Sequence, residues 1–267
     1  MPNDPMAIMS VGWRIEPLCR RYLGVQFQPL TMQVGERGTV RTALWAIGLL
    51  DQHESDILGS WFVPNSGQVS YQRILGEIKS RGVEEVDAFV SDRPMQFRKQ
   101  GCIAFARATV LPSLWNLLQR SFVETSQRDR RTLANTLGTI VEQTSVEAAR
   151  DALRTLAASP LGAAYPDVVG RWSTAVKQLE PMYALSARLR RVLRLGDGIV
   201  KQLHESLNRA VARHGSFADE DAAMSFLAAA LQRAERRLDR RGMDRAPTAG
   251  MSVVRQSKKV QTLARFV

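Results

Sequence analysis

The chain has 267 residues, of which 45% are hydrophobic and 24% are charged, so it is long enough to bury a large core and has an ordinary globular composition. No apolar run approaches the ~20 residues of a membrane span, and no basic segment followed by an apolar one opens the chain, which predicts a cytoplasmic protein. The two cysteines and three histidines have no metal-ligand spacing, which argues against structural zinc.

The balance of charge favours a polyanionic partner. Lys and Arg number 37 against 26 Asp and Glu, which leaves +11, and the excess arginine is weighted to the C-terminal half. Contacts to phosphates release counterions, so such a surface favours DNA. A helical bundle with a solvated arginine face would give the same pattern.

Three strands are predicted first. Residues 25–34 alternate apolar and polar, and Pro29 in that run indicates an edge or a bulge. Residues 40–50 and 56–63 are more continuously apolar. The links between these runs are short and polar, so we expect an antiparallel meander.

A helix and a fourth strand follow. Apolar residues at helical spacing predict a helix that ends near Gly82, and residues 83–90 predict a short strand. A strand after a crossover helix is most simply parallel to an earlier strand, so Asp92 is expected at its carboxyl end, where α/β sheets place ligand groups. The alternative is that Asp92 only forms the turn before Pro94.

The rest of the chain is predicted to be helical. After one more apolar run at 103–111, helical spacing continues to residue 154, with Thr144-Ser145 as a cap, and again over 168–179. Gly196-Asp197-Gly198 is predicted as a flexible turn before a short helix at 203–214. Residues 222–238 form the strongest helical pattern, and 242–262 indicate a basic tail that orders on binding.

The helix at 203–214 carries the most suggestive polar group. Glu205 shares a helical face with Asn208 and Arg209, one turn on, so the three side chains can address one substrate. The alternative is a surface ion pair between Glu205 and Arg209.

This order of elements resembles an RNase H-like nuclease, and the residues resemble the catalytic half of Mutator-type bacterial insertion-sequence transposases. The similar blocks are residues 46–48, 58–61, 79–83, 92, 148–153, 165–166, 171–172, 190–192, 205–209 and 215–217. The resemblance implies an α/β fold, an RNase H-like mixed sheet with a helical insertion and a helical C-terminal part. Its expected units are an extension at 1–24, the sheet part at 25–112, the insertion at 113–195, C-terminal helices at 196–241 and a tail at 242–267.

The resemblance also implies a metal site. In that family two Asp and one Glu hold divalent ions beside the scissile phosphate, and oxygen ligands suit Mg²⁺. Asp92 and Glu205 match two of these carboxylates, as catalytic and metal-binding residues. The first Asp aligns with Gln28, or with Gln26 if the next loop is counted without a gap, and an amide cannot supply the missing charge.

Other family features bear on DNA. The family's Cys-x-x-His pair falls on Ser113 and Asn116, and its N-terminal DNA-binding region is not matched in this sequence. DNA-contacting residues implied by position and charge are Trp172, Arg190, Arg191, Asn208, Arg209 and Arg213. For Trp172, packing between helices is an equal alternative to stacking on DNA.

Three functions remain open from the sequence. The first is a transposase-like DNA-binding protein that is inactive or repurposed, because Gln replaces the first carboxylate. The second is an active Mg²⁺-dependent transposase or nuclease whose third ligand is displaced, for instance to Asp51, Asp56 or Asp87. The third is a protein-interaction module or homo-oligomer without DNA binding.

Overall fold

The computed structural model describes residues 17–50, 54–64 and 70–245. A mixed sheet with the strand order β3-β2-β1-β4-β5 forms its centre, and the short β6 (Ser216–Phe217) pairs with the end of β1. β1 (Arg21–Val34), β2 (Thr39–Leu49) and β3 (Ser55–Val63) are antiparallel neighbours, which confirms the predicted meander.

The fourth strand also lies as predicted. The helix α1 (Tyr71–Ser80) leads to β4 (Glu85–Ser91), which is parallel to β1. The helix α2 (Pro94–Ala104) then leads to β5 (Thr109–Pro112), parallel to β4. The apolar run at 103–111 is therefore divided between the end of α2 and the start of β5.

Pro29 is tolerated in β1 because of how its neighbours are arranged. β1 pairs with β4 only as far as Gln26, opposite Val90, and with β6 only from Gln33. Between these points β1 has a strand neighbour only on the β2 side, so the missing N–H of Pro29 costs little there. The same gap leaves room for side chains between β1 and the end of β4.

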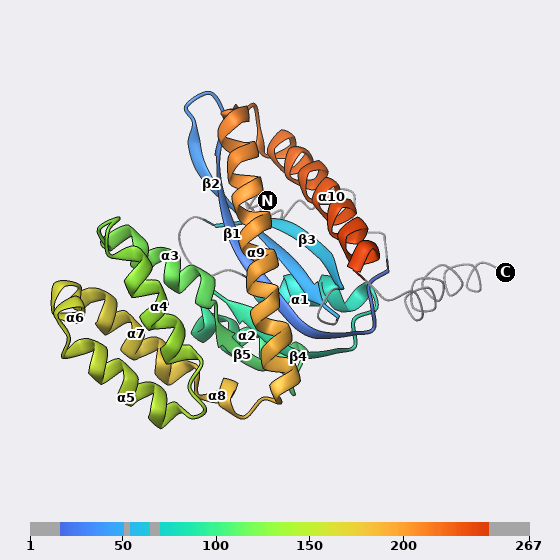
Figure 1. Cartoon of the computed structure of the whole chain (residues 1–267). Coiled ribbons are helices and arrows are strands. Elements are labelled where there is room, and N and C mark those ends of the chain that lie inside the picture. Colours follow the sequence, from blue (N-terminus) through green and yellow to red (C-terminus); the bar gives the residue numbers. More distant parts are fainter. Residues whose placement is uncertain (1–16, 51–53, 65–69, 246–267) are drawn as a thin grey trace.

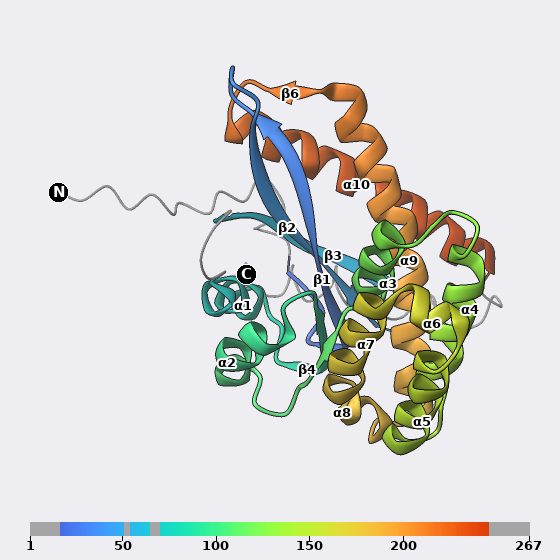
Figure 2. The same ribbon diagram turned by 90° about the vertical axis from the view of Figure 1, so that its left-hand side faces the viewer.

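Helices cover both faces of the sheet, as Figures 1 and 2 show. One face packs on α1 and α2 through an aromatic core that includes Phe27, Phe89 and Phe97. The other face packs on α9 (Ala187–His214) and α10 (Glu220–Arg245). From Val25 onward, alternation along β1 assigns its odd-numbered residues, such as Phe27, to the first face and its even-numbered ones to the second.

The helical insertion forms a separate layer beside the sheet (Figure 1). It consists of α3 (Leu114–Glu124), α4 (Arg130–Val141), α5 (Val146–Ala157), α6 (Pro160–Ala164), α7 (Pro166–Gln178) and α8 (Glu180–Tyr183). Its core includes Leu137, Leu153 and Trp172. The predicted cap at Ser145 is present, since its hydroxyl accepts a hydrogen bond from the Ala148 N–H at 3.1 Å.

The turn predicted at Gly196-Asp197-Gly198 is wrong, because these residues lie inside the continuous 28-residue helix α9. The sequence pattern was misleading because Gly196 serves close packing, not chain reversal. A Cβ at Gly196 would lie 2.3 Å from Leu49 Cδ1. The glycine thus lets α9 approach β2 closely.

The architecture confirms the predicted α/β fold with an RNase H-like order of strands and helices. The domain boundaries inferred from the sequence stay predictions, and the proposed tail lies mostly outside the described residues. Within the described ranges, no helix has both the length and the apolar character that crossing a bilayer requires.

Candidate functional site

Asp92 lies directly after β4, at its carboxyl end, as the sequence predicts. The last pair between β1 and β4 is Gln26 with Val90. Two residues further along β1, Gln28 lies on the face covered by α9. Its side chain donates to Ser113, which lines one pocket with Asp92, so the two residues share this neighbour.

The carboxyl of Asp92 is nearly enclosed, with 8% of its side chain exposed. Burial raises its pKa, while the guanidinium groups of Arg93 and Arg120 act in the opposite direction. The closest nitrogens of the two arginines are 3.9 and 3.8 Å from Asp92 Oδ2. The turn itself is fixed by Ser91, whose hydroxyl accepts the Arg93 N–H at 3.1 Å.

Gln28 is fully buried and directed toward the start of α3. Its Nε2 donates to Ser113 Oγ at 3.4 Å, and its Oε1 has no hydrogen-bond partner among the described residues. Ser113 caps α3 by accepting the Asn116 N–H at 3.2 Å, and its own N–H donates to the Ser91 carbonyl. The positions aligned with the family's first Asp and its Cys-x-x-His pair are thus neighbours, but they hold amide and hydroxyl groups.

Gln26, the other candidate for the position of the family's first Asp, has different hydrogen-bond partners from Gln28. Its Nε2 donates to the Leu193 carbonyl and to Asp197 Oδ1, each at 3.3 Å. Asp197 retains some exposed surface, yet burial of its carboxyl raises the pKa to about 7, and the hydrogen bond from Gln26 lowers it only in part.

Asp197 was missed as a site residue because its two flanking glycines indicated a turn. The available signal was helical spacing, since Leu193 precedes it by four residues and Val200 follows it by three, and both are buried. Residue 197 therefore belongs to the stripe of α9 that faces the sheet.

Glu205 lies on α9 and is half-buried. Its carboxylate makes no hydrogen bond or ion pair with any residue the structure describes, so the predicted pair with Arg209 is absent. In the described ranges, no three side chains of His, Cys, Asp or Glu are grouped closely enough to share a metal ion.

The residues suggested for displaced metal ligation have other surroundings. Asp51 lies outside the described residues. Asp56 accepts a 2.7 Å hydrogen bond from the Tyr22 hydroxyl, and Asp87 pairs with Arg21 at 3.0 Å. Neither belongs to the group of side chains around Asp92.

The residues suggested for DNA contact divide into two sets. Trp172 is 2% exposed, and its Nε1 donates to Ser121 Oγ at 3.0 Å, so it packs in the insertion as the second alternative for this residue describes. Arg190 is half-buried beside Gln26 and Asp197. The remaining four lie exposed along α9: Arg191, Asn208, Arg209 and Arg213.

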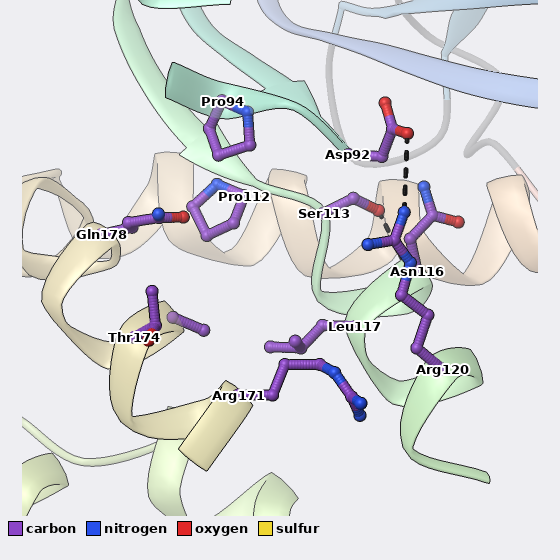
Figure 3. Close-up of a pocket in the computed structure, with 11 residues that line it drawn as sticks. Asp92, Pro94, Pro112, Ser113, Asn116, Leu117, Arg120, Arg171, Thr174 and Gln178 are labelled. Atoms are coloured by element: carbon purple, nitrogen blue, oxygen red, sulfur yellow. Dashed lines mark hydrogen bonds and ion pairs between the residues drawn. The ribbon is translucent and has the colours of Figure 1, made fainter. Parts of the chain in front are cut away.

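A pocket of about 260 Å³ opens between Asp92 and the helical insertion (Figure 3). Ser113, Asn116 and Arg120 line it from the α3 side, and α7 contributes Arg171, Thr174, Ala175 and Gln178. Two donors in this lining, Asn116 Nδ2 and Arg171 Nη1, are buried without a hydrogen-bond partner in the described part of the chain.

Comparisons with known proteins match the chain to insertion-sequence transposases. The chain is 28% identical over 221 residues to the transposase for insertion sequence element ISRM3 of Rhizobium meliloti, covering 82% of this chain and 55% of that protein. It is 24% identical to a probable insertion-sequence transposase of Corynebacterium diphtheriae, covering 80% of this chain and 63% of the other. The chain thus spans little more than half the length of these relatives.

Two further comparisons bear on the family. A Drosophila P element transposase strand transfer complex is 13% identical, covers 68% of this chain and 50% of its own, and has a TM-score of 0.25, which is too low to support an argument. The sequence profile described as "Transposase, Mutator family" matches residues 7–239. Because that match covers most of the 267 residues, the chain belongs to the Mutator family of transposases.

Proposed function

We propose that this chain is a transposase-like DNA-binding protein whose catalytic centre is inactive or repurposed. The observation that carries the proposal is a glutamine at the position that the family's first Asp would take, which is Gln28 or, in the alternative alignment, Gln26. The Gln28 amide is held by Ser113, and neither amide is charged at any physiological pH. Neither can therefore help to neutralise two close divalent ions.

The residues present fit a two-metal centre poorly. Asp92 and Glu205 would be the carboxylates that hold Mg²⁺, and the ion would supply an activated water or hydroxyl and a stabilised leaving oxygen. Asp92, however, faces two guanidinium groups. Their positive charges oppose the binding of a divalent cation at this carboxyl.

DNA binding is supported by charge and by the family. The chain carries a net charge of +11, and α9 presents Arg191, Arg209 and Arg213 on its exposed side. The matched relatives are named as transposases for insertion sequence elements. A protein that has lost catalysis but kept this surface would still bind DNA, for example as a competitor of an active transposase.

A strand-transfer and nicking assay tests the loss of catalysis. The purified chain is incubated with DNA substrates and either Mg²⁺ or Mn²⁺, beside a Glu205→Gln variant. We expect no metal-dependent cleavage above the level of that variant. Robust cleavage that Glu205→Gln abolishes would overturn the proposal and favour the active enzyme with a displaced ligand.

Calorimetry separates the two catalytic alternatives in another way. An active enzyme requires Mg²⁺ binding at millimolar concentration that depends on Asp92. We expect no such heat for the wild-type chain or for Asp92→Asn. A clear difference between the two proteins would support the active alternative.

A further inference from the structure

The pocket beside Asp92 is lined by hydrogen-bond donors that have nothing to bind. Asn116 Nδ2 and Arg171 Nη1 are both buried and lack an acceptor in the described part of the chain. Buried donors without partners are costly, so such groups usually mark the place of a ligand or water. A ligand that satisfies both must be rich in acceptor atoms.

The ion pairs around the pocket leave hydrogen-bond donors of Arg171 and Arg120 available to a ligand. Arg171 pairs with Glu124 through its other terminal nitrogen, Nη2, which fixes the guanidinium while Nη1 remains unused. Arg120 is 61% exposed at its side chain, and its 3.8 Å separation from Asp92 is too long for a hydrogen bond. It can therefore turn toward an anion without breaking a strong contact.

The start of α3 adds to the positive potential. Ser113 is the N-cap of this 11-residue helix, and Asn116 and Leu117 of its first turns line the pocket. The amino end of a helix carries a partial positive charge and favours phosphate groups. Figure 3 shows Ser113, Asn116 and Arg120 gathered at one end of the pocket, with Arg171 opposite.

The size of the pocket limits the ligand. Its volume of about 260 Å³ lies just below the ~300–1,000 Å³ of ordinary small-molecule sites. It can hold one small group but not a duplex. Pro94, Pro112 and Leu117 form apolar walls, and the polar lining includes Ser113, Thr174, Gln178 and the carboxyl of Asp92 besides the three donors.

We propose that this pocket binds one phosphate group through Asn116, Arg120 and Arg171, without a metal ion. The inference rests on the proposed DNA-binding function for its source of phosphate, which is either the phosphorylated end of a DNA strand or an internal phosphodiester.

The first experiment uses inorganic phosphate and the full chain, observed by phosphorus NMR at constant ionic strength with chloride as the balance. We expect saturable binding that Asn116→Asp weakens by about tenfold or more, since it replaces a charge-assisted donor with a carboxylate. Asn116→Leu keeps the side-chain volume and removes the amide donors, so we expect it to weaken phosphate binding as well. Asn135→Leu, on the exposed side of α4, is the matched control and should bind as the wild type does.

The second experiment identifies the source of the phosphate. Two single strands of one sequence, with and without a 5′-phosphate, are compared by fluorescence anisotropy. If the terminal group enters the pocket, the phosphorylated strand binds more tightly and Asn116→Asp removes that difference. If an internal phosphodiester enters, both strands bind equally and Asn116→Asp weakens both.

The outcomes separate this inference from the proposed function. The phosphate-binding inference is overturned if the wild type binds no phosphate, or if the wild type and folded Asn116→Asp bind it equally. This holds even if the chain binds duplex DNA well. Phosphate binding that depends on Asn116, without any DNA affinity at low salt, upholds the pocket and overturns the DNA-binding function. Circular dichroism and thermal melting of each variant establish that it is folded.

Discussion

Asp197 is a carboxyl group that accepts a hydrogen bond from Gln26, and it lines one pocket with apolar side chains and with Arg190 and Arg194. Its folded pKa of about 7 lies above the ~3.9 of an unfolded Asp. In the window between these values the folded chain holds a proton that the unfolded chain has lost. The contribution of this group to stability is therefore complete below pH ~4, falls as the pH rises, and is gone above pH ~7.

This difference predicts a measurable loss of stability with pH. Between pH 5 and 8 the wild type should lose about 3 kcal/mol of unfolding free energy relative to Asp197→Asn. Asn keeps the oxygen that accepts from Gln26 and removes the charge. Urea unfolding of both proteins at several pH values provides the measurement. Parallel curves for the two proteins would contradict the prediction.

Gln28 offers a second test at the same scale. Gln28→Asp adds a carboxylate beside Asp92, and a higher count of charged oxygen ligands increases affinity for hard cations. We expect Mn²⁺ to bind about tenfold or more tightly than to the wild type, as measured by calorimetry. The double variant Gln28→Asp with Asp92→Asn is the control and should lose the gain. Unchanged affinity in Gln28→Asp would indicate that residue 28 is not the position of the family's first ligand.

Among elements, α9 decides how the site is built, because it is the helix that reaches from the insertion across the sheet. Gly196 and Gly198 lie two residues apart in this helix and face different surroundings. A Cβ at Gly196 would meet Leu49 Cδ1 at 2.3 Å and Gln26 Nε2 at 3.0 Å, whereas one at Gly198 would meet nothing within 4 Å. The two glycines therefore form a matched pair for mutation.

Alanine should have opposite effects at these positions. Gly196→Ala overpacks a buried contact and should destabilise the fold by about 1–3 kcal/mol. Gly198→Ala should stabilise it by roughly 0.5–1 kcal/mol, because alanine has the higher helix propensity and the side chain would be exposed. Chemical denaturation of both variants checks the pair. Equal changes of the same sign would show that α9 does not approach the sheet at Gly196 as described.

The same helix shows what the sequence could and could not predict. The first strand followed from period-two alternation and the next two from continuous apolar runs, and the place of Asp92 followed from the rule for crossover connections. The continuity of α9 did not follow, because Gly196-Asp197-Gly198 has turn composition and the reason for Gly196 is close contact with Leu49, a residue far away in sequence. Similarly, the separate surroundings of Gln26 and Gln28 depend on where α9 and α3 lie, which local patterns do not contain.

At the scale of the molecule, the exposed arginines of α9 lie on one side of the sheet. The exposed face of α9 lies on one side of the sheet, and α1 and α2 lie on the other (Figure 2). Arg191, Arg209 and Arg213 are exposed on α9. A DNA-binding surface predicts that these arginines matter more than an equal charge elsewhere.

Salt dependence measures this difference. Each phosphate contact contributes about −0.9 to the slope of log affinity against log salt, so a triple alanine variant of Arg191, Arg209 and Arg213 should reduce the slope by about 2–3. The charge-matched control replaces Arg73, Lys99 and Arg107, which are exposed on or beside α1 and α2. It lowers the net charge equally, so a purely general attraction would give both variants the same slope. Equal slopes would place the DNA elsewhere on the molecule, and the absence of binding at low salt would leave protein interaction as the function of these helices.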